Sequence, residues 1–121
     1  MKIAIPSETD QGLQSFRSGH FGHAAYFTIV EIDDYGQVVS VESVKNVDHG
    51  AQGCGGVIQY VIGLGLDGIL TAGMGPRPYT TFTQNGITVY SDRSEPIVGN
   101  ALQLFLEGKV TPMDPGNVCR H

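Results

Sequence analysis

Two histidines separated by two residues lie on a segment that is rich in glycine. They are His20 and His23, in the stretch Gly19-His20-Phe21-Gly22-His23. Neutral imidazole is a common ligand of transition metals, and protonated imidazole is a cation that attracts an anion. We expect the whole segment His20–His23, including Phe21 and Gly22, to contact a bound cofactor. The competing interpretation is that Phe21 fills the core and the histidines satisfy local backbone groups, and this spacing outside a helix does not decide between the two.

A second group of this kind is the stretch His49-Gly-Ala-Gln-Gly-Cys-Gly-Gly, which leads into a helical pattern. The free N–H groups at a helix start bind anions, and glycines leave those groups accessible. A cysteine at a helix start gains thiolate character, and thiolate is a ligand for soft metals. We therefore predict cofactor contacts from Gly53, Cys54, Gly55 and Gly56, with Cys54 as a third candidate metal ligand. Alternatively, the glycines only permit close helix packing and Cys54 is a small core residue.

A third group, Gly73-Met-Gly-Pro-Arg77, is another glycine-flanked helix start. It lacks the lysine and Ser/Thr of a phosphate-binding loop, and it does not match the dinucleotide-binding fingerprint. We expect the amides of Gly73 and Gly75 to extend the anion site, and Arg77 to supply a cation. Met74 offers a soft thioether, although methionine at such a position more often packs in the core.

Charge is unevenly distributed along the chain. Twelve acidic residues against seven basic ones give a net charge of −5, which disfavours nucleic-acid binding. No acidic residue occurs over residues 11–30, 49–66 or 68–91, the stretches that contain the three groups above. This pattern favours an anionic ligand. The ending Cys119-Arg-His121 could also capture a metal, but one such pair in a tail is usually incidental.

The 121 residues, 40% of them apolar, predict one domain over residues 1–110 followed by a polar tail over 111–121. Hydrophobic periodicity predicts strands over 1–6, 24–32, 37–44, 67–72 and 87–90. It predicts helices over 53–64, 76–84 and 94–107, with Ser94 as the cap of the last one. The order βββαβαβα favours an α/β fold with a five-stranded mixed sheet and helices on both faces.

This order has a consequence for the three groups. If the first and third strands run the same way as the fourth and fifth, four strands end at one edge of the sheet. The loop over residues 7–23 and the starts of all three helices then lie at that edge, where ligands of open α/β sheets bind. The histidine pair and the glycine-rich helix starts are therefore expected to lie close together.

Several functional classes are disfavoured. No segment is long and apolar enough to cross a membrane, the chain begins in a strand-like segment without a signal peptide, and two cysteines make no disulfide framework, so we expect a cytoplasmic protein. A two-metal nuclease needs carboxylates that the first strand, first helix and fourth strand lack. No nucleophile–base arrangement is legible by spacing. We expect a protein that is not an enzyme and binds neither membrane nor nucleic acid.

Five parts of the chain resemble the dinitrogenase iron–molybdenum cofactor biosynthesis family: MKIAIP, SGHFGHAAYFTIVEID, GCGGVIQYVIGLGLDGILTAGMGP, NGITVY and the final helix. The resemblance covers about residues 1–110. The family includes carriers of nitrogenase cofactor precursors and the orange protein of sulfate reducers, which holds a molybdenum–copper sulfide cluster. The most specific matches are the turn at His20–Gly22 and the strand–GxGP–helix unit at Gly73–Pro76.

The resemblance implies a ribonuclease H-like fold and a bound anionic metal–sulfur cluster. The cluster would be of the Mo/Cu/S kind or an Fe–Mo–S precursor, held at the histidine turn and the glycine-rich helix start. Relatives often carry arginine at the position of His23, so this residue is expected to act either as a ligand or as a cation. The alternative is a protein-interaction or regulatory module without a cluster.

Overall fold

The computed structural model describes residues 1–47 and 49–113, with the backbone alone for residues 49–55. Two short 3-10 turns, η1 (Gly12–Gln14) and η2 (Phe21–His23), lie between the first two strands. The strands are β1 (Lys2–Ser7), β2 (Tyr26–Ile32), β3 (Val38–Lys45), β4 (Gly68–Thr71), β5 (Thr88–Ser91) and β6 (Thr111–Pro112). The helices are α1 (His49–Ile62), α2 (Pro76–Gln84) and α3 (Val98–Leu106).

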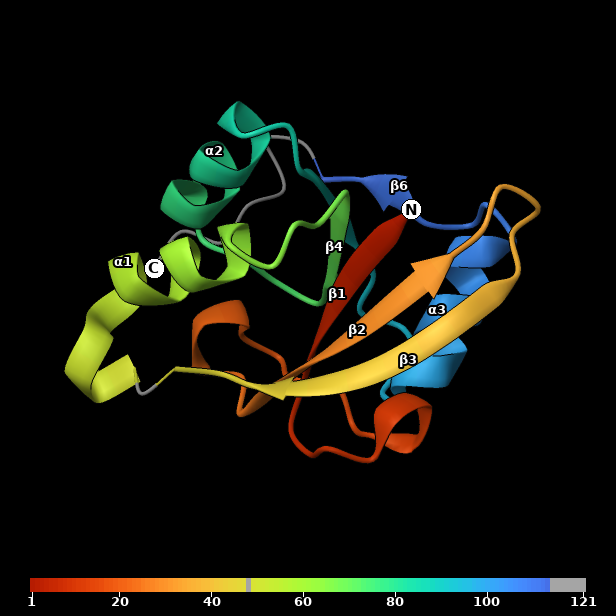
Figure 1. The fold of residues 1–121 in the computed structure, drawn as a ribbon, viewed down its shortest axis with the longest axis horizontal. Coiled ribbons are helices and arrows are strands. Elements are labelled where there is room, and N and C mark those ends of the chain that lie inside the picture. Colours follow the sequence, from red (N-terminus) through yellow and green to blue (C-terminus); the bar gives the residue numbers. More distant parts are fainter. Residues whose placement is uncertain (48, 114–121) are drawn as a thin grey trace.

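Within the described residues, the strands form one mixed sheet of six strands in the order β3-β2-β1-β4-β5-β6 (Figure 1). Strands β1, β4 and β5 are parallel to one another, whereas β2 is antiparallel to both β1 and β3. Strands β1, β3, β4 and β5 therefore end at the same edge, which we call the carboxyl edge. The predicted gathering of strand ends is confirmed.

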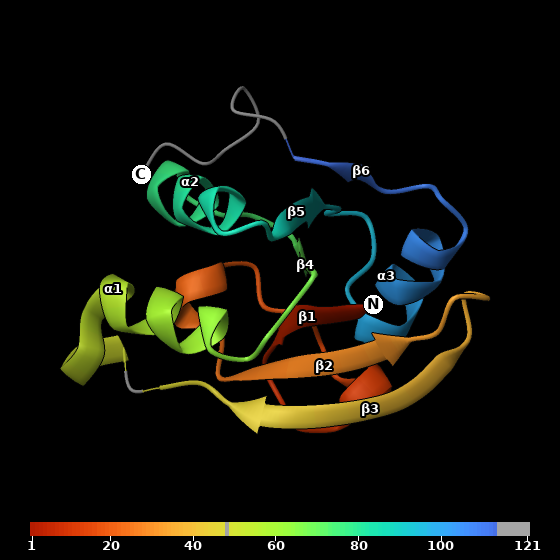
Figure 2. The ribbon, with the colours of Figure 1, turned by 45° about the horizontal axis from the view of Figure 1, so that its top comes forward.

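The core has one apolar layer on each face of the sheet, because alternate residues of a strand point to opposite faces. Ile3 and Ile5 of β1 pack with Val98 and Leu102 of α3. Ala4, between them, belongs to the cluster that buries α1 and α2. Figure 2 shows α1 and α2 on one side of the sheet and α3 on the other. The predicted α/β class with helices on both faces is confirmed.

The sheet has a strand that the sequence pattern did not predict. Thr111 and Pro112 form β6, which pairs antiparallel with Ser91 and Tyr90 at the end of β5. Met113, the next residue, is buried in the layer under α1 and α2. The prediction of five strands is therefore wrong by one, and the first three residues of the expected polar tail belong to the sheet and the core. A threonine followed by a proline shows no strand pattern, although proline is tolerated on an edge strand.

Two helix starts also differ from the prediction. Helix α1 begins at His49, one turn before the predicted start at Gly53. Helix α3 begins at Val98 after an extended Ile97, so Ser94 does not cap it. Pro96 disfavours helical geometry at the residue before it, which explains the late start. Among the described residues, no helix combines the length and apolar character that crossing a lipid bilayer requires.

Candidate functional site

The carboxyl edge brings three loops together. The loop after β1 carries the histidine pair, the loop after β4 leads into α2, and residues 92–97 connect β5 to α3. Ser7, the last residue of β1, forms an antiparallel bridge with Arg17, and Phe16 forms another with Ile97. The Ser18 amide donates to the carbonyl of Pro6 at 3.0 Å. These backbone bonds fix the first loop against the end of β1 and the start of α3.

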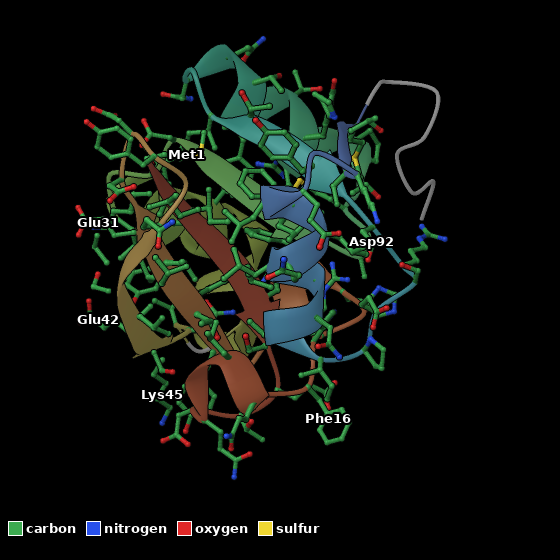
Figure 3. All side chains as sticks on the ribbon, turned by 90° about the vertical axis from the view of Figure 1, so that its right-hand side faces the viewer. Met1, Phe16, Glu31, Glu42, Lys45 and Asp92 are labelled. Carbon is green, nitrogen blue, oxygen red and sulfur yellow. The ribbon has the colours of Figure 1, made fainter. Side chains whose placement is uncertain are left out.

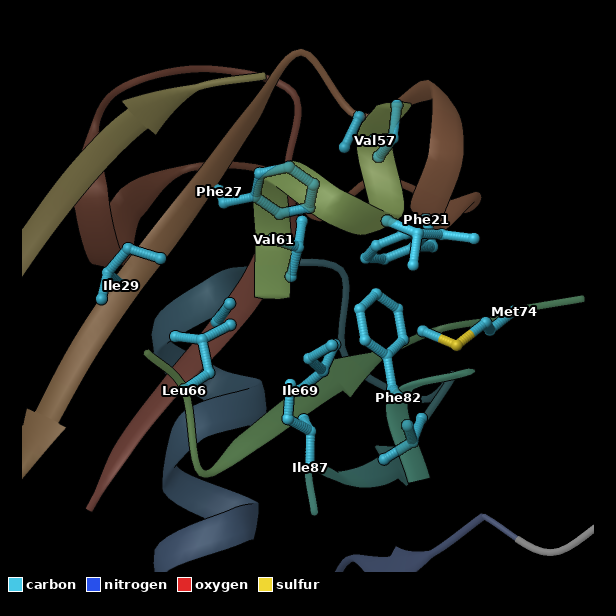
Figure 4. Close-up of a cluster of buried hydrophobic side chains, with 14 of the residues drawn as sticks. Phe21, Phe27, Ile29, Val57, Val61, Leu66, Ile69, Met74, Phe82 and Ile87 are labelled. Atoms are coloured by element: carbon cyan, nitrogen blue, oxygen red, sulfur yellow. The ribbon is translucent and has the colours of Figure 1, made fainter. Parts of the chain in front are cut away.

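The histidine turn is anchored by its phenylalanine. Phe21 is 3% exposed, and its ring centroid lies 5.6 Å from that of Phe27 and 5.2 Å from that of Phe82. Figure 4 shows Phe21 in this cluster, together with Met74. Ser18 Oγ also donates to the His20 carbonyl at 2.9 Å, which holds the entry to the turn. Phe21 therefore fills the core, as one of the two interpretations of the sequence predicted.

The two imidazoles nevertheless lie at the surface. His20 and His23 are both exposed, and their ring centroids are 6.4 Å apart with the planes nearly perpendicular, at 87°. Rings at this separation can turn toward one bound atom or flank one small cluster. Among the residues that the structure describes, no three His, Cys, Asp or Glu side chains gather in a group that could hold a metal ion. The candidate metal ligands at this turn, among the described residues, are thus two imidazoles.

The open amides of α1 lie earlier in the chain than the sequence predicted. Only the first four N–H groups of an α-helix lack a partner within the helix. These belong to residues 49–52, whereas Gly53, Gly55 and Gly56 lie in the second turn, where each amide faces the carbonyl four residues earlier. The expected anion site at the amides of Gly53–Gly56 is therefore corrected, because the helix starts earlier. The side chain of Cys54, like Cys119 and His121 in the tail, lies outside the described part of the chain.

The start of α2 has fewer donors than its glycines suggest. The Gly73 amide already donates to Thr71 Oγ1 at 3.2 Å. Pro76 and Pro78, two of the first three helical residues, have no N–H group. Met74 is 2% exposed and lies in the core, as the packing interpretation expected. The remaining features of this helix start are Gly75 at the N-cap position and the exposed Arg77.

Neither close packing nor a positive φ requires a glycine at Gly19 or Gly75, two positions at the carboxyl edge. A Cβ atom at Gly19 would meet no atom within 4 Å, and one at Gly75 would meet only Pro78 Cδ at 3.8 Å. Neither residue has a positive φ. By contrast, a Cβ at Gly68 would lie 3.1 Å from the Tyr90 ring and 3.2 Å from the Thr88 carbonyl oxygen. Packing explains Gly68, whereas Gly19 and Gly75 leave backbone exposed beside the histidine turn and the start of α2.

One cation of the acid-free stretches, Arg17, was not among the predicted site residues. The Arg17 side chain is only 3% exposed, and its Nη1 donates to Asp92 Oδ2 and to the Glu95 carbonyl oxygen, each at 3.1 Å. Figure 3 shows Asp92 on the side of the molecule that carries α3, away from Glu31 of β2 and Glu42 of β3. A charged residue in a polar loop gives no pattern of burial, so its neighbours along the chain could not reveal this contact.

The ion pair perturbs both groups. Burial lowers the pKa of Arg17 from its ordinary value, and the charge of Asp92 opposes this shift. Burial opposes ionisation of Asp92 as well, but hydrogen bonds from Ser94 and Glu95 and the charge of Arg17 outweigh it. The pKa of Asp92 is therefore held below its ordinary value. Arg17 stays charged at any ordinary pH, so the pair is an arginine cation beside a carboxylate.

Comparisons with known proteins agree with this architecture. The family model for the dinitrogenase iron-molybdenum cofactor matches residues 1–108. An uncharacterized protein of Methanocaldococcus jannaschii is 35% identical over 112 residues, which are 91% of this chain and 89% of that protein. The crystal structure of a protein named PH0822 is 31% identical with a TM-score of 0.78, and the match covers 93% of this chain and 96% of that one.

A further similar structure is the apo form of the orange protein from Desulfovibrio gigas. It is 28% identical with a TM-score of 0.74, and the match covers 93% of this chain and 96% of that one. The resemblance seen in the sequence is thus confirmed by a family match over nearly the whole chain. The chain belongs to the dinitrogenase iron-molybdenum cofactor family.

Proposed function

We propose that this protein is a non-enzymatic carrier of an anionic metal–sulfur cluster or cofactor precursor, bound at the carboxyl edge. Membership of the family and the similarity to the orange protein support a cofactor-related carrier role. The observation that carries the proposal is the pair of exposed imidazoles, His20 and His23, on a turn that Phe21 anchors in the core.

The two imidazoles would hold the cluster as neutral ligands through a metal atom. Imidazole suits copper and iron, and sulfide atoms of the cluster would complete the coordination of that metal. His23 could also act as an imidazolium cation toward the cluster charge. The cluster would be of the Mo/Cu/S kind or an Fe–Mo–S precursor, and no covalent bond to Cys54 is needed to hold it.

The surroundings of the turn suit an anion with sulfide atoms. Gly19 and Gly75 expose backbone without a steric requirement of the fold, so a bulky ligand can approach the chain there. Arg77 adds an exposed cation at the start of α2. The acid-free stretches 11–30 and 68–91 contain both of these segments. Among the acidic residues of the loops at this edge, Asp92 is paired with Arg17.

An enzymatic role has less support. Two-metal nucleases of ribonuclease H-like architecture need convergent carboxylates. Strand β1 and strand β4 contain no Asp or Glu. We assign the ribonuclease H-like fold class as part of this proposal, supported by three antiparallel strands followed by parallel ones and by helices on both faces. We also place the carrier in the cytoplasm, where Cys54 would stay reduced.

Anaerobic reconstitution tests the proposal. Purified protein is incubated with tetrathiomolybdate and Cu(I), desalted, and assayed for a visible chromophore and for bound metal and sulfide. We expect the wild-type protein to retain the chromophore and His20→Ala to lose most of it. Tyr35→Ala, at an 88% exposed residue in the hairpin at the opposite edge, is the control and should bind like wild type.

Two results would contradict the carrier role. One is a wild-type protein that retains no chromophore with either tetrathiomolybdate and Cu(I) or an iron–sulfur precursor. The other is a His20→Ala variant that binds as much cluster as the wild type. If, in addition, a protein partner stayed bound after removal of all metal, the module without a cluster would be favoured.

A further inference from the structure

We propose that Arg17 anchors the cargo by binding one tetrahedral oxoanion or thioanion unit of the molybdate class along its Nε–Nη2 edge. This inference deepens the proposed function and rests on it, but a simple anion is enough to test it. Arg17 was not among the site residues expected from the sequence, and its role follows from the hydrogen bonds that its guanidinium group does not make.

The buried polar atoms of the described side chains are nearly all hydrogen-bonded. The exceptions are Thr9 Oγ1 and two nitrogens of Arg17, Nε and Nη2. All three atoms lie in the loop that follows β1. Buried donors without an acceptor are rare in native proteins, and those of a charged group are especially unfavourable. An acceptor for Nε and Nη2 of Arg17 is therefore missing from the described part of the chain.

The two nitrogens share one edge of the guanidinium group. Nη1 lies on the other side and is engaged by Asp92 and by the Glu95 carbonyl. The Nε–H bond and the adjacent Nη2–H bond of an arginine are parallel and point the same way. This fork matches two atoms of a single oxoanion, which it binds with two charge-assisted hydrogen bonds. The missing ligand must therefore present two acceptor atoms side by side.

The position of Arg17 is that of a ligand site. Its backbone is bridged to Ser7 at the end of β1, and its guanidinium group reaches Asp92, the residue after β5. Strand β4 lies between β1 and β5 in the sheet, so the side chain spans the carboxyl end of β4. Ligands of open α/β sheets bind at such strand ends. His20 follows three residues later in the same loop.

The neighbouring carboxylate does not supply the acceptor. Asp92 Oδ1 accepts from Ser94 Oγ at 2.7 Å, and Oδ2 faces Nη1 of Arg17. Because Nε and Nη2 are shielded from solvent, an anion must lose water to reach them. This requirement favours large anions of low charge density, such as molybdate and tetrathiomolybdate, over phosphate and sulfate. An ordered water molecule is the competing occupant.

The first test uses the wild-type protein. The side-chain Nε–H resonance of Arg17 is followed by ¹H–¹⁵N NMR during titration with molybdate, tetrathiomolybdate, sulfate and chloride. We expect molybdate or tetrathiomolybdate to shift this resonance in a saturable way, and sulfate and chloride to leave it in place. An unmoved resonance with every anion would mean that water fills the fork, and an equal response to all four would mean unspecific screening. Either result overturns the inference.

The second test compares two variants that each exchange one cation for another, by calorimetry with the anion that wild type binds. Arg17→Lys keeps the charge but removes the fork, and we expect at least a tenfold loss of affinity. Lys2→Arg, an exchange of cations at the opposite edge of the sheet, where β1 begins, should bind within twofold of wild type. Equal affinity of Arg17→Lys and wild type would overturn the inference. If Arg17→Lys does not fold, the wild-type resonance still decides.

These outcomes separate the inference from the proposed function. If Arg17→Lys retains the reconstituted chromophore in full, and molybdate does not shift the Arg17 Nε–H resonance of the wild-type protein, the carrier role stands and the anchoring role of Arg17 is wrong. If molybdate binds at Arg17 but wild type retains no cluster, the anion site stands and the carrier role is wrong.

Discussion

Replacing Phe21 by alanine should separate the anchoring of the histidine turn from the ligands on it. The ring is almost fully buried between Phe27 and Phe82. Removing a buried phenylalanine ring costs about 3–5 kcal/mol of unfolding free energy, including the loss of its aromatic contacts. Domains of this size are stable by about 5–15 kcal/mol, so Phe21→Ala should remain mostly folded in the absence of denaturant.

Urea denaturation of the apo protein provides the measurement. We expect a lower midpoint for Phe21→Ala with an unchanged slope, since the surface exposed on unfolding stays similar. Phe16→Ala, the same change at a 57% exposed residue of the same loop, should cost less than about 1 kcal/mol. Phe21→Leu keeps most of the apolar volume and should lose about half as much as Phe21→Ala.

The same variants connect stability to cluster binding. Phe21→Ala keeps both histidines but removes the side chain that fixes their turn, so reconstituted cluster should be retained less well than by Phe21→Leu. A loss of less than about 1 kcal/mol in Phe21→Ala would refute the reasoning, because the ring would then contribute no more than an exposed one. Equal cluster retention by Phe21→Ala and wild type would show that the turn needs no anchor to bind.

Two further predictions concern the ion pair and the glycines. The depressed pKa of Asp92 contributes stability that is present above the unfolded pKa of this carboxyl and is lost as the pH falls through its lower folded pKa. Asp92→Asn should therefore flatten the fall in the urea midpoint as the pH drops below the ordinary pKa of a carboxyl group. At pH 7 the same variant should lose about 1.5–3 kcal/mol of unfolding free energy, because Arg17 keeps its charge without its partner. If the urea midpoint of the variant fell with pH as steeply as that of wild type, the predicted flattening would be contradicted. Gly75→Ala should change the free energy of unfolding by less than about 1 kcal/mol, yet it should weaken cluster retention. Gly68→Ala should lose about 1–3 kcal/mol of unfolding free energy through its contact with Tyr90, and cluster retention per folded molecule should stay unchanged. The reverse pattern would exclude a role of Gly75 in giving the cluster access to the backbone.

The sequence was informative where local signals and packing agree. Helix α2 has the predicted bounds, because Pro76 favours a first helical turn and Asn85-Gly86 ends it. The carboxyl edge was also predictable, since chain order and the right-handed crossover rule constrain the topology strongly. Once these two features are known, the histidine loop and the start of α2 must lie at one edge.

The sequence pattern missed three further features, and two of them depend on contacts between distant residues. Residues 49–56 show no hydrophobic period and contain four glycines, which disfavour a helix, yet α1 begins at His49. The burial of Arg17 depends on Asp92, a residue 75 positions later. Strand β6 depends on pairing with β5 rather than on its own two residues. Periodicity within a window cannot reveal such contacts.

The candidate ligands at the carboxyl edge would suit transport of a metal cluster better than its permanent storage. Structural metal sites are closed by four protein ligands and contribute directly to folding. Here His20 and His23 lie exposed on the surface, and the described residues add no third ligand to them. A cluster held by two imidazoles and by hydrogen bonds from a guanidinium group can leave when an acceptor replaces two metal–nitrogen bonds. The fold would remain, because its core packs without the cluster. The proposed carrier role thus requires a site that is incomplete without its cargo, which agrees with the unmatched donors of Arg17.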